Sequence, residues 1–153
     1  MQTGEIHPPV KETDRPPTQI LVVEDNIEMR QICRHVLVRA GYVVITAANG
    51  EGGWTALQAE SYDLLITDNN LPGLSGVDLI TNLREAKITV PIILSAATVP
   101  PDSEKLGLAA VLIKPYSVDD LEKTVRAVLE QNSSTPRQRE LAPSGITDTP
   151  VDN

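Results

Sequence analysis

The sequence predicts an α/β fold with a doubly wound, five-stranded parallel sheet. Three observations support this fold class. Short apolar runs alternate five times with segments of helical period between about residues 19 and 131. The apolar runs 20–23, 64–66 and 92–94 are continuous, as in strands that are buried on both faces. Turn-forming residues punctuate the boundaries, and strands joined through helices by right-handed crossovers form a parallel sheet covered on both faces.

The first two strand–helix units have clear boundaries. The run 20–23 stops at Glu24-Asp25, and Asn26 can cap the helix that follows over residues 27–40. Its expected apolar stripe consists of Met29, Ile32, Cys33, Val36, Leu37 and Ala40. Gly41 ends this helix. The next strand is predicted at 42–47, and the helix at 51–60 is weaker because it contains two glycines.

The remaining units follow the same alternation. The strand 63–68 ends at Asp68, and a helix is predicted over 77–84. The fourth strand is predicted at 91–94, ending at Ser95, and the fifth at 110–113, ending at Lys114. Ser117 with Asp120 forms a capping box that starts the last helix. Helix four is expected to be short or irregular, because two prolines lie at the start of its segment.

Composition limits the domain organisation and the classes of function. The 153 residues, 41% of them hydrophobic, predict one globular domain at 19–131, with flexible extensions at 1–18 and 132–153. A net charge of −8 argues against a nucleic-acid partner, because such binding depends on Lys and Arg. No apolar run is long enough to span a bilayer and no secretory signal is present, so we expect a cytoplasmic protein without membrane contact. The single cysteine, Cys33, excludes an internal disulfide and is expected in the core, and His35 is expected to face solvent.

Polar residues end four of the predicted strands, at the edge where parallel α/β sheets bind ligands. They are Glu24-Asp25, Asp68, Ser95 and Lys114. An aspartate followed by a turn can also act as a cap, so the position of Asp68 alone leaves both roles open. Three carboxylates gathered at one edge repel one another unless a cation intervenes, and Mg²⁺ prefers such oxygen ligands. The set predicts attack of an aspartate carboxylate on phosphorus, with the metal and Lys114 neutralising charge.

Residues 19 to about 131 resemble a response-regulator receiver domain of two-component signalling. The resemblance rests on Glu24-Asp25, the run from Asp68 to Gly76, Ser95-Ala96 and Lys114-Pro115, each at the end of a predicted strand. It implies a flavodoxin-like (βα)5 fold and Mg²⁺ as cofactor. The implied roles are phospho-acceptor for Asp68, metal ligands for Glu24, Asp25, Asp68 and the backbone carbonyl of Asn70, and phosphoryl contacts for Ser95 and Lys114.

The sequence departs from the family pattern at two places. The family's switch aromatic, three residues before the lysine, is replaced by Val111, which is small and stiff. The interval from Ser95 to Lys114 is also about one helical turn shorter than usual. Both departures fall on the usual output surface, so the phosphorylation site is expected to be more complete than the switch that reports on it.

The leading hypothesis is a stand-alone receiver. It accepts a phosphoryl group on Asp68 from a sensor histidine kinase or a histidine phosphotransfer protein, and acts by phosphorelay or by binding an unknown output partner. Such a domain phosphorylates and dephosphorylates itself and is not a turnover enzyme. The alternative is a pseudo-receiver that binds its partner independently of phosphorylation, which Val111 and the short fourth helix favour. A phosphatase with an aspartyl nucleophile is disfavoured, because Asn70 stands where such enzymes carry an acid.

Overall fold

The computed structural model describes residues 16–133, which form alternating strands and helices. In chain order the elements are β1 (Gln19–Val23), α1 (Ile27–Arg39), β2 (Val43–Ala47), α2 (Gly50–Ala59), β3 (Leu64–Asp68), α3 (Gly76–Glu85), β4 (Ile92–Ala96), η3 (Ser103–Leu106), β5 (Ala110–Ile113) and α4 (Val118–Ser133). The predicted fold class is confirmed. The element labelled α4 is the helix that was expected as the fifth.

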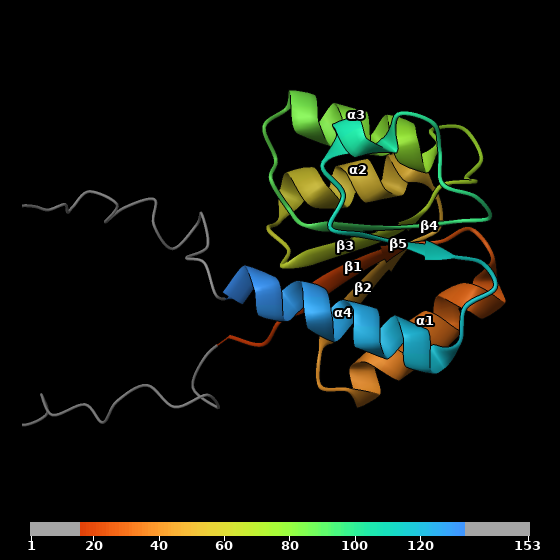
Figure 1. Ribbon diagram of the computed structural model, residues 1–153. Helices are drawn as coiled ribbons and strands as arrows, with labels where there is room; N and C mark the ends of the chain where they lie inside the picture. The colour runs from red at the N-terminus through yellow and green to blue at the C-terminus, as the bar shows by residue number, and fades with distance from the viewer. Residues whose placement is uncertain (1–15, 134–153) are drawn as a thin grey trace, which may run out of the picture.

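The five strands form one parallel sheet in the order β2-β1-β3-β4-β5. Helices α1 and α4 cover one face of this sheet, and α2 and α3 cover the other (Figure 1). Every crossover therefore returns the chain to the same edge, so all five strands end on the same side of the molecule. This edge carries the polar residues that the sequence analysis singled out.

Two apolar clusters fill the space between the sheet and its helices. Alternate strand residues point to opposite faces, so Ile20 and Val22 join the cluster under α1 and α4, whereas Leu21 and Val23 join the cluster under α2 and α3. The inner strands β3 and β4 are buried at every position. This explains their continuous apolar runs, since both of their faces lie against a helix layer.

The helix starts follow the capping signals of the sequence. Asn26 Oδ1 accepts a hydrogen bond from the amide of Met29 at 2.9 Å. Ser117 Oγ accepts from the amide of Asp120 at 2.9 Å, and the carboxylate of Asp120 accepts from the amide of Ser117 at 3.1 Å, which confirms the capping box. Two members of the predicted apolar stripe of α1 were wrong. The side chain of Ile32 is 47% exposed, and Ala40 is an exposed C-cap residue that follows the helix.

The fourth repeat contains only the 3₁₀ turn η3, as the prolines predicted. The guanidinium of Arg84, near the end of α3, holds the end of this connection in place. It donates to the carbonyls of Leu106 at 3.1 Å and Gly107 at 3.0 Å, and also to those of Ile88 and Val90 at 3.2 Å. Four backbone carbonyls of two loops thus converge on one side chain.

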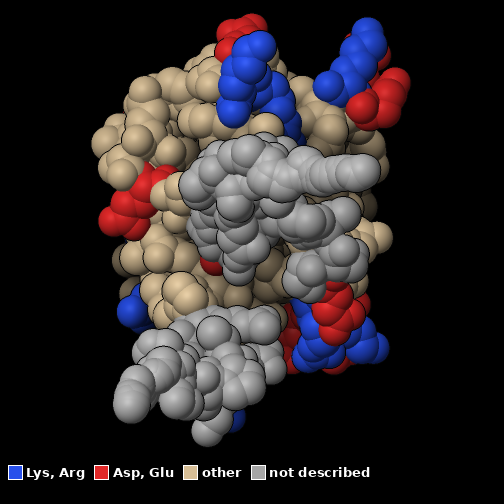
Figure 2. Space-filling model, turned by 90° about the vertical axis from the view of Figure 1, so that its left-hand side faces the viewer, with Lys and Arg blue, Asp and Glu red and all other residues tan. Residues whose placement is uncertain are grey.

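Helix α4 extends to Ser133, two residues beyond the expected end of the domain at 131. The predicted flexible extensions lie largely outside the described residues, which begin at 16 and end at 133. Among the helices of this range, none combines the length and the apolar character needed to cross a bilayer. On the face shown in Figure 2, basic and acidic side chains lie beside one another in small groups separated by uncharged surface.

Candidate functional site

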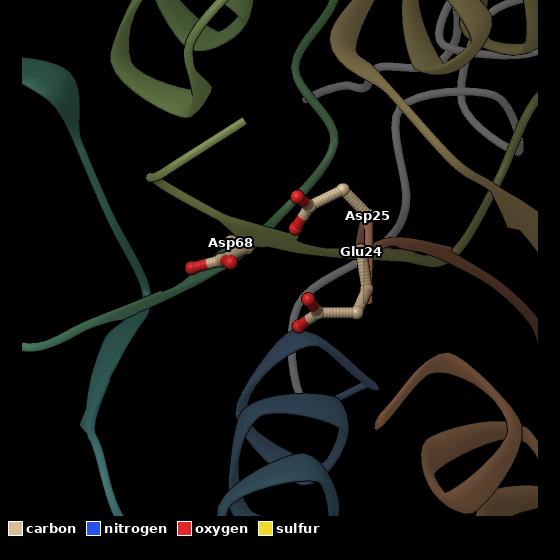
Figure 3. Close-up of side chains that lie close together, drawn as sticks. All are labelled: Glu24, Asp25 and Asp68. Atoms are coloured by element: carbon tan, nitrogen blue, oxygen red, sulfur yellow. The ribbon is translucent and has the colours of Figure 1, made fainter. Parts of the chain in front are cut away.

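Three carboxylates meet where β1 and β3 end. A carboxylate oxygen from each of Glu24, Asp25 and Asp68 lies within 4.8 Å of those of the other two. Figure 3 shows Asp25 and Glu24 extending to opposite sides of their strand, with Asp68 beside them on the neighbouring strand. Glu24 and Asp68 are each only 4% exposed, whereas Asp25 is exposed. The juxtaposition that the sequence predicted is therefore present in the fold.

Lys114 follows β5 and provides the nearest positive charge. Its Nζ donates to Asp68 Oδ2 at 3.0 Å and lies 3.9 Å from Glu24 Oε1. One third of the lysine side chain remains exposed. Three carboxylates with one ammonium leave a net negative charge at a largely buried place, which is an electrostatic reason to take up a cation.

Burial dominates the ionisation of Glu24. Removal from water raises the pKa of this carboxyl above its usual 4.5, and the charges of Asp68 and Asp25 raise it further. The amide of Asn26, which donates to Glu24 Oε2 at 3.1 Å, and the ammonium of Lys114 act in the opposite direction. The net upward shift means that the protein without a metal holds the ionised form of Glu24 at a cost in free energy.

Arg30 supports the acidic pair from α1, and this role was not anticipated. Its Nη1 donates to the carbonyl of Glu24 at 2.8 Å and to that of Asp25 at 3.3 Å. These bonds hold the backbone on which both carboxylates stand. The sequence contained a signal for such a contact, because a basic side chain in the first turn of a helix interacts unfavourably with the helix dipole and is stabilised there by hydrogen bonds to other groups.

The turn after β3 is fixed by hydrogen bonds to β4 and to α3. The Asn69 amide donates to the Ser95 carbonyl at 2.9 Å, and Asn69 Oδ1 accepts from the amide of Val77 at 3.0 Å. The amide of Asn70 points at Asp68 Oδ1 at 3.5 Å, so the Asn70 backbone lies beside the carboxylate. Gly76 has no room for a Cβ, which would overlap the Asp68 carbonyl oxygen. The glycine allows α3 to start directly against the end of β3.

Ser95 lies inside β4 and does not follow it, which corrects the predicted end of that strand. It stands opposite Asp68 in the register of β3 and β4. The residue is 2% exposed, and its Oγ has no hydrogen-bond partner among residues 16–133. A buried hydroxyl without a protein partner is rare in native proteins and needs an explanation, such as a catalytic role or a bound water, ion or ligand.

The residues at this edge fit a divalent metal ion. Two buried carboxylates and one exposed carboxylate supply hard oxygen atoms, and the unpartnered Ser95 hydroxyl adds a donor for an anion bound alongside. Mg²⁺ keeps several waters and is bound in proteins through one or two carboxylates. The exposure of Asp25 is compatible with such a partly hydrated ion.

The expected switch position is also as the sequence predicted. Val111 lies in β5 and is partly buried, and η3 replaces a full fourth helix. Tyr116 follows the Lys114-Pro115 pair in the loop after β5 and was not expected to be the switch residue. Its hydroxyl lies 3.9 Å from the Cys33 sulfur, and the aromatic ring packs against the cluster under α1 and α4.

Comparison with known proteins agrees with this geometry. Residues 20–126 match the family described as the response regulator receiver domain. The alkaline phosphatase synthesis transcriptional regulatory protein PhoP of Bacillus subtilis is 32% identical over 118 residues, covering 74% of this chain and 49% of PhoP. The probable transcriptional regulatory protein SilR of Salmonella typhimurium is 33% identical over 138 residues, covering 88% of this chain and 59% of SilR. The chain thus spans about half the length of PhoP and somewhat more of SilR.

Solved structures show the same fold. The chemotaxis response regulator CheY4 of Vibrio cholerae superimposes with a TM-score of 0.69 at 29% identity, over 74% of this chain and 99% of CheY4. The response regulator TrrA of Thermotoga maritima, in complex with Mg²⁺ and BeF, superimposes with a TM-score of 0.66 at 30% identity, over 72% of this chain and 98% of TrrA. With a family match that extends over more than half of its length, the chain belongs to the response regulator receiver domain family.

Proposed function

We propose that this receiver domain accepts a phosphoryl group on Asp68 in a Mg²⁺-dependent reaction, with a phosphohistidine of a sensor kinase or phosphotransfer protein as donor. The observation that carries the proposal is the group formed by three carboxylates within 4.8 Å of one another and Lys114 Nζ at 3.0 Å from Asp68 Oδ2. Mg²⁺, when bound, neutralises charge that builds up on the phosphoryl oxygens.

The side chains divide the work according to their chemistry. An oxygen of Asp68 forms the new bond to phosphorus while the bond from phosphorus to the donor nitrogen breaks, and the imidazole leaves with the electron pair. Glu24 and Asp25, with the carbonyl of Asn70, hold the metal. Lys114 is close enough to Asp68 to pair with the transferred group. Ser95 supplies a hydroxyl donor from the opposite strand.

The experiment compares the wild type with Asp68→Asn and with the control Asp78→Asn. Asp78 is an exposed acid in the first turn of α3. Each protein is incubated with Mg²⁺ and a small acyl phosphate, and intact mass is measured. We expect the wild type and the Asp78 variant to gain one phosphoryl group, and Asp68→Asn to gain none. Gain of a phosphoryl group by Asp68→Asn, or none by the wild type, contradicts the proposal.

A second candidate is a pseudo-receiver that acts through binding alone. It is favoured by Val111 at the position of the family's switch aromatic and by the 3₁₀ turn in place of the fourth helix. Amide exchange rates of the segment 97–109, measured with and without Mg²⁺ and beryllofluoride, separate the two candidates. Exchange rates that do not change when beryllofluoride binds support the pseudo-receiver, whereas a change supports a working switch.

A further inference from the structure

We propose that the Tyr116 hydroxyl is a positioning group for the phosphorylation site, because it orients the Ser95 hydroxyl toward Asp68. The inference rests on the proposed acceptance of a phosphoryl group by Asp68. Val111, at the position of the family's switch aromatic, has no hydroxyl and cannot make this hydrogen bond. We assign the bond to Tyr116 instead. The chain of hydrogen bonds runs from Tyr116 O–H to Ser95 Oγ, and from Ser95 O–H to an oxygen on the group that Asp68 carries.

The alternation of the sheet places these residues on one side. Asp68 and Ser95 are register partners in adjacent strands, so their side chains extend to the same face of the sheet. That face is the one under α1 and α4, because Ile66 and Ile93, two residues earlier in each strand, both belong to its apolar cluster. Tyr116 packs against the same cluster.

Tyr116 reaches this face from the loop between β5 and α4. Its hydroxyl lies 3.9 Å from the sulfur of Cys33, a residue of α1 that is buried. The Ser95 hydroxyl is also close enough to affect the ionisation of Tyr116, although the two oxygens do not meet hydrogen-bond geometry. The Tyr116 oxygen thus has one weak contact, with the Cys33 sulfur, and one nearby polar group, the Ser95 hydroxyl, which has no hydrogen-bond partner among the described residues.

The protonation state of Tyr116 suits a donor. Burial raises the pKa of its hydroxyl, and the neighbouring Cys33 raises it further, so the proton stays on the oxygen at neutral pH. Burial also raises the pKa of the Cys33 thiol. A neutral sulfur is a weak acceptor, so Tyr116 loses little when its hydroxyl turns from Cys33 to Ser95.

The Ser95 hydroxyl needs a hydrogen-bond donor once it gives its own proton to the group on Asp68. A serine hydroxyl has one proton to give and two lone pairs that accept. If the proton goes to an anion on Asp68, the lone pairs remain in a buried place without a donor. Lys114 is already engaged with Asp68 and Glu24. The Tyr116 hydroxyl lies near Ser95 and can donate to it. When Ser95 Oγ accepts this hydrogen bond, the hydrogen bond that Ser95 donates becomes stronger.

The test measures binding of beryllofluoride in the presence of Mg²⁺ by calorimetry. Four proteins are compared with the wild type: Tyr116→Phe, Ser95→Ala, the double variant, and the control Tyr42→Phe. Tyr42 is also partly buried and packs against the same cluster, but its ionisation is affected by charges on α4 and not by Ser95. Thermal melts without ligand establish that each variant is folded.

We expect Tyr116→Phe to weaken binding about fivefold, the value of one net hydrogen bond, while Tyr42→Phe binds as the wild type does. The double variant should bind no more weakly than Ser95→Ala, because without Ser95 the tyrosine has nothing to orient. Additive losses in the double variant, or unchanged binding by Tyr116→Phe, overturn the proposal. A wild type that does not bind at all refutes the proposed function itself and removes the basis of this inference.

A second measurement does not depend on the variants' affinities. The ultraviolet Raman doublet of tyrosine reports whether the phenol hydroxyl donates a hydrogen bond. We expect the contribution of Tyr116, obtained as wild type minus Tyr116→Phe, to shift toward the donor form when Mg²⁺ and beryllofluoride are added. The shift should be absent in Ser95→Ala. A doublet that stays unchanged in the wild type on ligand binding contradicts the proposal, even if Tyr116→Phe alters affinity.

Discussion

Replacement of Glu24 by glutamine is expected to stabilise the metal-free protein. At 4.8 Å and an effective dielectric constant of 20, two unit charges repel by about 3.5 kcal/mol, and Glu24 faces both Asp68 and Asp25 within that distance. Lys114 at 3.9 Å offsets about 4 kcal/mol of this repulsion. Water screens the exposed Asp25, so a net gain of about 1–3 kcal/mol in the free energy of unfolding remains for Glu24→Gln. This corresponds to a rise in Tm of roughly 4–12 °C.

The gain should depend on pH with a definite sign. The folded-state pKa of Glu24 lies above its usual 4.5, so the folded protein binds this proton more tightly than the unfolded chain does. The associated stability is complete below the unfolded pKa and is lost as the pH rises through the folded pKa. Glutamine does not titrate. The difference in Tm between Glu24→Gln and wild type should therefore be small at about pH 4 and largest at about pH 8.

Thermal melts followed by circular dichroism, in EDTA and in excess Mg²⁺, test this reasoning. Mg²⁺ should raise the Tm of the wild type and have less effect on Glu24→Gln, which lacks one of the proposed metal ligands. Glu28→Gln is the matched control, because Glu28 is an exposed acid in the first turn of α1. A Glu24→Gln protein that melts at or below the wild-type temperature at about pH 8 in EDTA would show that the carboxylates do not repel as described.

Three further substitutions test other features. In urea melts, Lys114→Met should lower the free energy of unfolding by about 2 kcal/mol at about pH 8 and by less at about pH 4, because the carboxylates of Asp68 and Glu24 lose their partner. The control Lys123→Met removes only an exposed ion pair and should change the free energy of unfolding little. Lys87 has a φ of 64°, so Lys87→Gly should raise the Tm by the equivalent of about 1 kcal/mol, whereas Lys87→Ala should not. In Gly76→Ala the new Cβ meets the Asp68 carbonyl, so calorimetry should show a loss of Mg²⁺ and beryllofluoride binding together with a lower Tm. Normal binding by Gly76→Ala would refute the close approach of α3 to β3.

The fold could be predicted because its signals are local. Apolar runs, capping residues and prolines each act over a few neighbouring residues, and together they located every strand and helix to within a few residues. The exposed side chain of Ile32 escaped this reasoning, since the width of a helix's buried stripe depends on the neighbouring elements. The end of β4 was also missed, because Ser95 and Ala96 look like turn residues until pairing with β3 and β5 extends the strand.

The charged residues of the candidate site could be predicted from the sequence, whereas the contacts made by the neighbouring residues could not. Parallel strands end at one edge, so the order of the strands alone brings Glu24, Asp68 and Lys114 together. The contacts of Arg30 and Tyr116 depend on how α1 and the loop after β5 pack in three dimensions. The position of Arg30 in the first turn of α1 signals that it needs a partner, but no spacing in the sequence identifies the groups that Arg30 and Tyr116 contact.

The hydrogen bonds of Arg84 divide the connection between β4 and β5 into two halves of unequal local stability. The guanidinium holds the second half at Leu106 and Gly107, while the first half, residues 97–101, lies next to Ser95 and receives none of these bonds. Local opening of the first half therefore does not require breaking the second, and its amides should exchange with solvent at a lower free energy of opening. Under the proposed phosphorylation of Asp68, reorganisation of this short segment would not carry the free-energy cost of moving a whole helix.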